Sequence, residues 1–511
     1  MHSDRAIPIQ TDYIAPQTKE NIRLDATMKI SSSAKRFGQS PAGILLPFLG
    51  LLVVAGCAVG PRYHQPAVNA PVDYRFANTH TTNSLANLPW QDVFRDPMLQ
   101  DLIRVTLTNN YDIQAAVARV EQARYAVIAA RSPLYPQIGY GGDVGRGRNA
   151  LYNSPISTGG AVESSALAGV NAAWEIDFWG RIRQLTRAAQ AQYLATDEAR
   201  RSVTITLISD VATAYYQLLD LDQELQIQYA ATNAYAGSYR IFNDRLINGV
   251  ASKLETDRAY AAMASAAAVI PQLDIQIAAT EDQINILMGR NPGRIPRDSL
   301  TNQPEPQMEI PVGLPSDLIR RRPDVLAAEQ LLIAANANVG ASLADFFPHI
   351  GLTTFLGKAS PELSAFTAGS ANFWNVGATL SGPLFQGGQL YSQYQSSKAK
   401  FQEAGATYQQ SVLTAFREVS DALIARQKLA DVYTQDEQAV IALSSSVELA
   451  TERYLNGKSS YFEVLQAQQE LYPAQTVLVQ AQAGEWIAVV QLYKALGGGW
   501  NASDETKTSQ K

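Results

Sequence analysis

An uninterrupted heptad pattern from Gly388 to Leu455 constrains the fold of this 511-residue chain more than any other feature. The segment has no proline, and its seventh positions are mostly apolar or small, as in the row Tyr394, Phe401, Tyr408, Ala415, Ala422, Leu429. A seven-residue repeat keeps one seam of a helix facing a partner helix. At 1.5 Å per residue this helix would be roughly 100 Å long, whereas ordinary helices average about 11 residues.

The end of this helix predicts a tight reversal of the chain. Asn456-Gly457 interrupts the pattern, and the pattern resumes from Ser460 to Leu496. Glycine tolerates the positive φ that a tight helix end requires. We therefore predict an antiparallel helical hairpin whose tip lies at Asn456-Gly457.

The same pattern occurs earlier in the chain. Arg245-Leu-Ile-Asn-Gly249 and Arg453-Tyr-Leu-Asn-Gly457 lie 208 residues apart, and so do Glu255 and Glu463. Flanking segments match at similar offsets, among them Pro136-Gln-Ile138 with Pro348-His-Ile350. Internal repeats decide the architecture. We predict a tandem duplication in which each half holds a helix, two short strands, a very long helix, a tight turn and a return helix.

Proline-rich stretches and the repeats divide the chain. We expect an N-terminal extension and signal peptide at 1–56, an extended strap at 57–95, a first repeat at 96–295, a proline-rich linker at 296–313, a second repeat at 314–500 and a polar, disordered tail at 501–511. Asp96 is expected to begin a single helix that continues to about Ser132, where Pro133 ends it. Ser316 is expected to cap the first helix of the second repeat.

The N-terminal region has the pattern of a secretory signal. Lys29, Lys35 and Arg36 precede an apolar run, 44–56, that ends in small residues. The residues before this signal are out of place there, which makes Met28 a candidate for the true start.

The signal ends at the chain's one cysteine. Val54-Ala55-Gly56-Cys57 resembles a bacterial lipobox, in which the cysteine is acylated and becomes the mature N-terminus. Two or three acyl chains anchor a protein stably, whereas one is marginal. Ala58 follows in place of aspartate, which in bacterial lipoproteins usually implies the outer membrane. The alternative is a buried cysteine at the end of an apolar segment.

Four segments alternate with the period of a β-strand. One row is Ala168, Val170, Ala172, Trp174, Ile176, Phe178; the others contain Ile138, Tyr140, Val144; Ile350, Leu352, Thr354, Leu356; and Trp374, Val376, Ala378, Leu380. Strands that are apolar on one face and small or polar on the other are the signature of a transmembrane β-barrel. A soluble antiparallel sheet with one wet face gives the same pattern. The lipobox and the aromatic strand ends favour the membrane.

Four strands are too few to close a membrane barrel, because the smallest such barrels have about eight. An open sheet edge is not tolerated in lipid, where unpaired backbone groups find no water. The strands are therefore expected to be pooled among subunits. Three copies would supply twelve strands, an even and sufficient number.

The composition argues against other functions. The net charge is −6, without the basic stripe that nucleic-acid binding requires. The four histidines are scattered, and no Cys/His metal spacing, nucleophile elbow or phosphate-binding loop is present. We expect no enzyme, no cofactor and no metal site.

Taken together, these residues resemble the TolC-like outer-membrane efflux proteins, in particular the lipoprotein branch that serves multidrug pumps. The resemblance covers essentially 57–500, including Phe385-Gln-Gly-Gly388, Phe416-Arg-Glu-Val419 and both Asn-Gly tips. It implies a mainly α fold with a transmembrane β-barrel, in which a homotrimer forms a 12-stranded barrel and a periplasmic α-barrel. It also implies a periplasmic adaptor and an inner-membrane pump as partners, and a passive exit duct in the outer membrane.

The resemblance implies two kinds of functional residue besides Cys57. The tips would dock the adaptor through Asn248, Gly249, Val250, Asn456, Gly457 and Lys458. The tunnel would narrow just past the second tip, at Phe462, Glu463 and Gln466. Relatives commonly have aspartate at Gln466 and arginine at Gln469, so the acidic ring is expected to be thinner here.

Alternatives stay open at this point. Phe462 is otherwise an ordinary seam residue, and Glu463 a solvated helix charge. For the whole protein, the alternatives are a structural lipoprotein that spans the periplasm without conducting and an exit duct of a protein or peptide secretion system. The sequence does not choose the cargo, because the partner recognises it.

Overall fold

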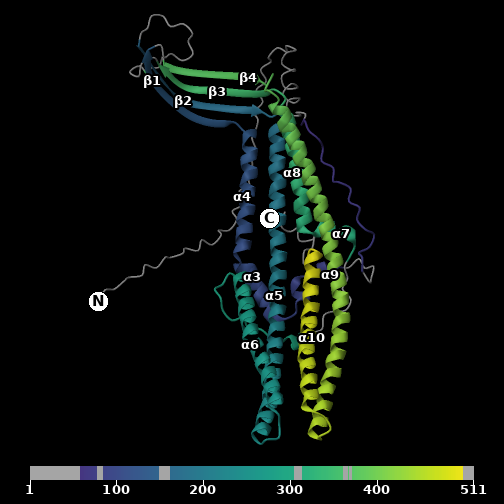
Figure 1. The fold of residues 1–511 in the computed structure, drawn as a ribbon. Helices are drawn as coiled ribbons and strands as arrows, with labels where there is room; N and C mark the ends of the chain where they lie inside the picture. The colour runs from purple at the N-terminus through teal and green to yellow at the C-terminus, as the bar shows by residue number, and fades with distance from the viewer. Residues whose placement is uncertain are drawn as a thin grey trace, which may run out of the picture. The chain divides into compact units, whose positions relative to one another are not determined.

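The structure is a computed structural model, and it describes residues 58–76, 84–148, 162–303, 313–360, 366–367 and 371–498. The predicted signal peptide, Cys57 and the tail lie outside the described residues. Figure 1 shows the strands at one end of the long helices and the hairpin turns at the other. The elements in chain order are η1 Leu85–Asn87, α2 Trp90–Val93, α3 Pro97–Asn109, α4 Tyr111–Arg131, η2 Ser132–Leu134, β1 Gln137–Arg148, β2 Val162–Ile176, α5 Arg181–Ile247, α6 Lys253–Leu287, η3 Leu300–Asn302, α7 Pro315–Arg321, α8 Pro323–Ala344, β3 His349–Ser360, β4 Asn372–Ser381, α9 Gln389–Leu455 and α10 Tyr461–Ala495.

The two hairpins predicted from the repeats are confirmed, and they match in length. Helices α5 and α9 each have 67 residues, and α6 and α10 each have 35. Each long helix begins after a glycine in the left-handed region, Gly180 at φ 81° and Gly388 at φ 86°. The chain is therefore a duplicated structure in which the two halves use the same turn and helix lengths.

The prediction of a single helix from Asp96 to about Ser132 is wrong, because the helix is interrupted at Asn110. The Asn110 backbone is extended, and its side chain accepts hydrogen bonds from the backbone N–H groups of Asp112 and Ile113. Its amide also donates to the backbone oxygen of Leu287 at 2.8 Å. Asparagine competes with the helical backbone for hydrogen bonds, and here a contact with the end of α6 decides the outcome.

The predicted cap at Ser316 is also wrong. Helix α7 begins at Pro315, whose missing N–H and fixed φ suit the first helical position. Leu314 precedes it as the cap residue and offers no side-chain hydrogen bond. Proline therefore sets the start of this helix two residues earlier than a serine cap at Ser316 would.

The four strands form one antiparallel sheet in the order β1-β2-β3-β4. Ile138 pairs with Ala172, Ala172 with Thr354, and Thr354 with Val376. Because even-numbered residues face each other in every pair, the apolar rows predicted from the sequence share one face of the sheet. The opposite face has mainly small and polar residues, and β1 and β4 are left as open edges.

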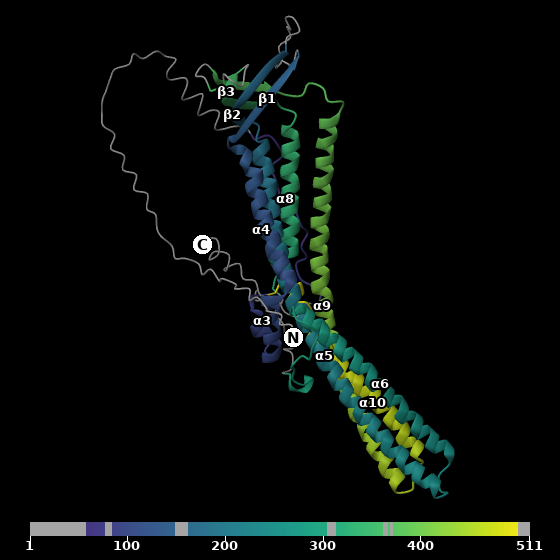
Figure 2. The same cartoon turned by 90° about the vertical axis from the view of Figure 1, so that its left-hand side faces the viewer.

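The main core lies where the two repeats meet, between α5, α8, α9 and α10. Tyr216 of α5 stacks on Trp486 of α10 with ring centroids 5.2 Å apart, and both side chains are buried. The Tyr215 hydroxyl donates to Asp96 Oδ2 at 2.5 Å, which fixes the start of α3 against α5. Figure 2 shows α5, α6 and α10 at the end opposite the strands, where α5 packs on both α6 and α10. The core therefore joins the hairpins at mid-length.

The segment predicted to be an extended strap is only partly so. Residues 58–76 contain no regular element. Two short helices, η1 and α2, follow within 84–93, and Phe94 after them is fully buried. Phe94 packs edge-on against Tyr493 of α10 at 5.7 Å, so the last part of the segment belongs to the core.

Candidate functional site: the hairpin tips and the helices behind them

Both tips end their long helices with the same hydrogen-bond pattern. In the first tip, the N–H of Val250 donates to Arg245 O at 2.8 Å, and that of Gly249 to Leu246 O at 2.9 Å. The second tip repeats this with Lys458 to Arg453 O and Gly457 to Tyr454 O. This is the Schellman arrangement, which requires a left-handed residue after the helix. Gly249 and Gly457 supply it at φ 74° and 69°.

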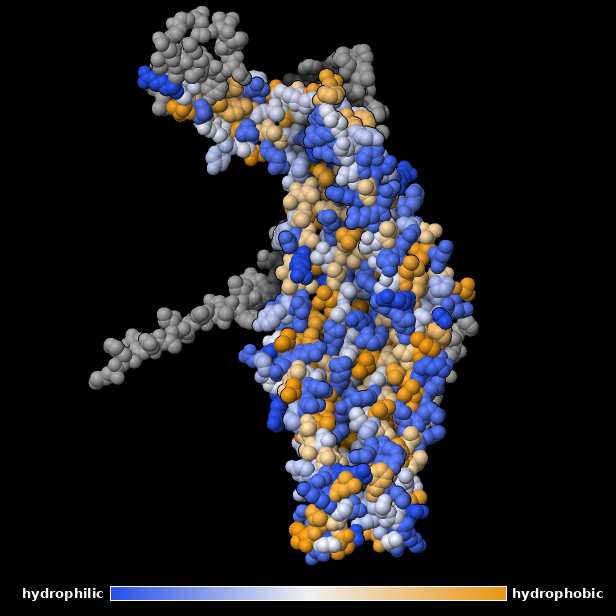
Figure 3. Space-filling view, viewed as in Figure 1, coloured by the Kyte–Doolittle hydropathy of each residue, from blue (hydrophilic) through white to orange (hydrophobic). Residues whose placement is uncertain are grey.

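The tips expose apolar side chains to solvent. Val250 is 68% exposed, and Ile247, Leu254 and Leu455 are also exposed. Figure 3 shows apolar residues gathered at the end of α5 and α6. Neither tip glycine has an atom within 4 Å of the position that a Cβ would take. The tips therefore present an open, partly apolar surface, the kind that a protein partner covers.

The equivalent glutamates Glu255 and Glu463 lie in different surroundings. Glu255 closes a capping box with Ser252, so its carboxylate is used in starting α6. Ser460 at the start of α10 makes no such bond. Glu463 instead lies 3.7 Å from Arg453 of α9, in an exposed ion pair. Its negative charge is therefore partly offset by Arg453 of its own hairpin.

Phe462 lies in the first turn of α10 and is 54% exposed. The Arg258 guanidinium of α6 lies over the ring, 5.4 Å from its centroid, which is the geometry of a cation–π contact. Both residues line a groove of about 560 Å³ between α5, α6 and α10. Gln469 lines the same groove, whereas the amide of Gln466 donates to Glu470 of its own helix at 3.2 Å.

Aromatic residues join the two hairpins just behind the tips. Tyr461 of α10 packs on Phe242 of α5, with centroids 4.5 Å apart, and on Tyr454 at 5.2 Å. The Tyr461 hydroxyl bonds to Ser238 Oγ, and the Arg245 guanidinium donates to the Tyr454 hydroxyl. Burial raises the pKa of Tyr461, so the neutral hydroxyl is retained at neutral pH.

The sequence interpretation missed this aromatic contact and Arg258. The signal was present, because aromatic residues recur at helical spacing on α5 and on the facing α10. The set is Tyr235, Tyr239, Phe242, Tyr461 and Tyr472. What the sequence did not contain is the register between the two hairpins, on which every one of these pairs depends.

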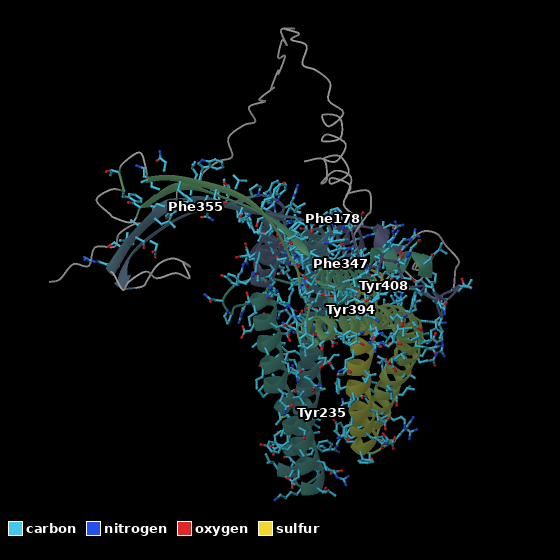
Figure 4. All side chains as sticks on the ribbon, turned by 90° about the horizontal axis from the view of Figure 1, so that it is seen from above. Phe178, Tyr235, Phe347, Phe355, Tyr394 and Tyr408 are labelled. Atoms are coloured by element: carbon cyan, nitrogen blue, oxygen red, sulfur yellow. The ribbon has the colours of Figure 1, made fainter. Side chains whose placement is uncertain are left out.

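At the other end, an aromatic cluster marks the junction of sheet and helices. Trp179 stacks on Phe347 with centroids 4.5 Å apart and packs edge-on against Phe178 at 4.9 Å. The Trp179 Nε1–H donates to Pro348 O at 2.9 Å. Figure 4 labels Phe178 and Phe347 at this junction and Phe355 within the sheet. Aromatic rings with one polar contact concentrate at membrane–water interfaces.

The fold combines a four-stranded sheet that has one apolar face with two helical hairpins, whose long helices have 67 residues each. This combination defines a class of protein. It is the class of outer-membrane channels with a helical extension into the periplasm. Comparison with known proteins agrees. Residues 102–290 and 314–498 match the family described as "Outer membrane efflux protein".

The chain is also similar to proteins of this family along almost its whole length. It is 35% identical over 469 residues to the solvent efflux pump outer membrane protein SrpC of Pseudomonas putida, covering 90% of this chain and 98% of that protein. It is 31% identical over 459 residues to the cation efflux system protein CusC of Escherichia coli K12, covering 89% and 99%. The solved outer-membrane channel OprN superposes with a TM-score of 0.80 at 28% identity, covering 87% of this chain and all of that one.

The chain therefore belongs to the outer membrane efflux protein family. It is an outer-membrane efflux channel with a periplasmic extension, in a family of ducts rather than of enzymes. The predicted fold class, function and localisation in the outer membrane are confirmed. The roles of individual tip and constriction residues stay predictions.

Proposed function

We propose that three copies of this chain form a passive exit duct for drugs or other small molecules, delivered by an inner-membrane pump through a periplasmic adaptor. The observation that carries the trimer is the open sheet edge at β1 and at β4. An edge in lipid leaves backbone groups unpaired, so β4 of one subunit must pair with β1 of the next. Three sheets of four strands close a barrel of ordinary size.

The exposed tips support adaptor docking. Asn248, Gly249 and Val250 at one tip, and Asn456, Gly457 and Lys458 at the other, lie at the end of the helices opposite the sheet. In an outer-membrane protein that end points away from the outer membrane and towards the pump. The names of the relatives do not agree on one cargo, because they specify solvents in one case and cations in another.

The constriction is proposed to lie where the hairpins are tied together. Phe462 would place three rings around the trimer axis, and such an apolar ring blocks ions by excluding water. Glu463 and Gln466 lie on the same helix within one turn, and Arg453 moderates the charge of Glu463. The contacts of Tyr461 with Phe242 and Ser238 would hold this end closed until the hairpins separate.

We also propose the domain limits and the lipid anchor given by the sequence. The repeats span 96–295 and 314–500, joined by the linker 296–313 and preceded by the segment 57–95, whose last part is helical and belongs to the core. Cys57 is the acylation site. Metabolic labelling with a fatty-acid analogue should mark the wild type but not Cys57→Ser. Equal labelling of both would contradict a lipid anchor at Cys57.

Single-channel recording of the purified protein in a planar bilayer tests the duct itself. We expect discrete conductance steps from trimers, with larger steps when the hairpins are loosened by mutation. A non-conducting lipoprotein that only spans the periplasm gives no steps in either case. Export of small molecules in cells lacking the channel, restored by this chain, separates an efflux duct from one for secreted proteins.

A further inference from the structure

A groove lies beneath the strap where the strap crosses α5 and α8. It has a volume of about 730 Å³, and it is lined by strap residues Ala58 and 60–63, by α5 between Gln184 and Leu194, and by α8 between Gln330 and Ala337. We call it the strap groove. It lies within one protomer, because α5 and α8 pack directly on each other.

Specific contacts fix the wall that the strap contributes. The Val59 N–H donates to Trp179 O at 2.9 Å. The buried amides of Gln184 and Asn336 donate to Val59 O at 3.3 Å and to Pro61 O at 3.1 Å. Gly60, at φ 137°, crosses so close to α8 that a Cβ there would lie 2.7 Å from Gly340 Cα. The groove is therefore built by buried polar contacts rather than by a loose segment.

The two arginines that line the groove have no partner within the described part of the chain. Nearby on α5, Arg181 is paired with Glu175 at 2.8 Å and Arg183 with Asp177 at 3.0 Å. Arg62 and Arg187 line the groove, and among the described residues neither makes an ion pair or a side-chain hydrogen bond. Two free guanidinium groups at one cavity favour an anionic group with several oxygen acceptors, because each binds two oxygens at once.

The position of the groove indicates where that anion comes from. At the end of the groove nearest the sheet, the strap is hydrogen-bonded to Trp179, which belongs to the aromatic cluster at the expected membrane interface. From Gln184 to Leu194 the groove extends along α5 by about 15 Å away from that cluster. The apolar side chains of Leu194 and Ile333 also line it. An occupant with both a charged and an apolar part fits this lining.

We propose that the strap groove binds the phosphate group of an anionic phospholipid from the periplasmic leaflet, through Arg62 and Arg187. The bound lipid would fasten the strap to α5 and α8 beside the proposed anchor at Cys57. This inference rests on the location of the sheet in the outer membrane. It does not involve the tunnel, so conductance is expected to be unchanged when the lipid site is lost.

Native mass spectrometry of the full trimer, after delipidation and addition of defined lipid, tests the site. Both lipids carry the same phosphodiester, but the ammonium group of phosphatidylethanolamine neutralises its headgroup and is repelled by the two arginines. Wild type should therefore retain phosphatidylglycerol at least about tenfold more strongly than phosphatidylethanolamine, and phosphatidylglycerol should raise its melting temperature. The double variant R62Q/R187Q should lose that preference, and R62K/R187K should keep part of it. R104Q/R119Q removes two exposed arginines elsewhere and should behave as wild type.

Other outcomes would overturn the proposal. The lipid site is contradicted if wild type retains both lipids equally. It is also contradicted if R62Q/R187Q keeps intact trimers and an unchanged lipid preference. Inorganic phosphate that displaces the lipid and gives the same melting temperature shift would assign the groove to a free anion. Additional lipid bound by Cys57→Ser would show that the protein's own acyl chain fills the groove. A wild-type protein that gives no conductance steps in the bilayer would instead contradict the proposed duct.

Discussion

Arg426 of α9 donates from Nη1 to Oε1 of Glu485 of α10 at 2.9 Å, and the two residues are only 7% and 8% exposed. This ion pair lies inside the main core, between the helices of the second hairpin. A buried pair is strongly stabilising only relative to a chain that keeps one partner and loses the other. The pair therefore commits α9 and α10 to one register.

The first prediction concerns this pair. Arg426→Met leaves Glu485 buried without its partner and should lower stability by about 3–5 kcal/mol. The double variant Arg426→Met with Glu485→Leu should recover most of the loss, since two apolar side chains replace two charges. Thermal melts of the detergent-solubilised trimer measure both. A double variant as unstable as the single one would mean that the two side chains stabilise the fold by more than cancelling each other's buried charge.

The second prediction concerns pH. Burial, and then the neighbouring Glu224 carboxylate, raises the pKa of Asp220 to about 7 from an ordinary value of 3.8. Because the folded protein holds this proton more tightly than the unfolded chain does, stability should fall as pH rises from about 4 to about 7 and then level off. Asp220→Asn should flatten this slope and raise the melting temperature at pH 8. Asp101→Asn, at an exposed site, should leave the slope unaltered.

The third prediction concerns the constriction. Phe462→Ala should increase single-channel conductance and sensitivity to large external antibiotics without disturbing the trimer, because an apolar ring excludes water from a narrow pore. Leu449→Ala removes a similarly exposed apolar residue from α9 and serves as the control. If both variants conduct as wild type does, Phe462 is an ordinary seam residue and the narrowing lies elsewhere.

The fourth prediction follows from the pairing of Glu463 with Arg453. Glu463→Gln should reduce the preference for cations, and Arg453→Gln should increase it, because the arginine offsets the carboxylate at 3.7 Å. Both effects should be clearest at low salt, since exposed charges are screened at high ionic strength. Reversal potentials at two salt concentrations measure them. Identical selectivity in the two variants would make Glu463 a solvated charge without a role in the pore.

The fifth prediction concerns the tips. Gly457→Trp should leave trimers intact but abolish crosslinking to the adaptor and drug export, because the exposed tip is proposed to be covered by the partner. Gly457→Ala imposes the same backbone strain without bulk and separates the two causes. Export that survives a tryptophan at both Gly249 and Gly457 would contradict docking at the tips. Loss of trimers in the alanine variant would indicate a purely structural turn.

The sequence predicted those parts of the fold that depend on local periodicity. The heptads of α9, the glycine at each tip and the alternation in β2 were sufficient for the hairpins and for the apolar face of the sheet. The break at Asn110 was missed because it depends on Leu287, which is distant in sequence. Likewise, Arg258 reaches Phe462 only because α6 and α10 both pack on α5. Contacts between elements require a register that no single element contains.

The equal lengths of α5 and α9, and of α6 and α10, have an evolutionary consequence. A helix cannot gain a turn by itself, because its tip would then pass beyond its neighbour and its heptad seam would lose its partner. A change in the distance that these helices cover therefore needs matched insertions on both arms of both hairpins. Lineages that adapt to a wider or narrower envelope are expected to differ by whole heptads, at equivalent places in the two repeats.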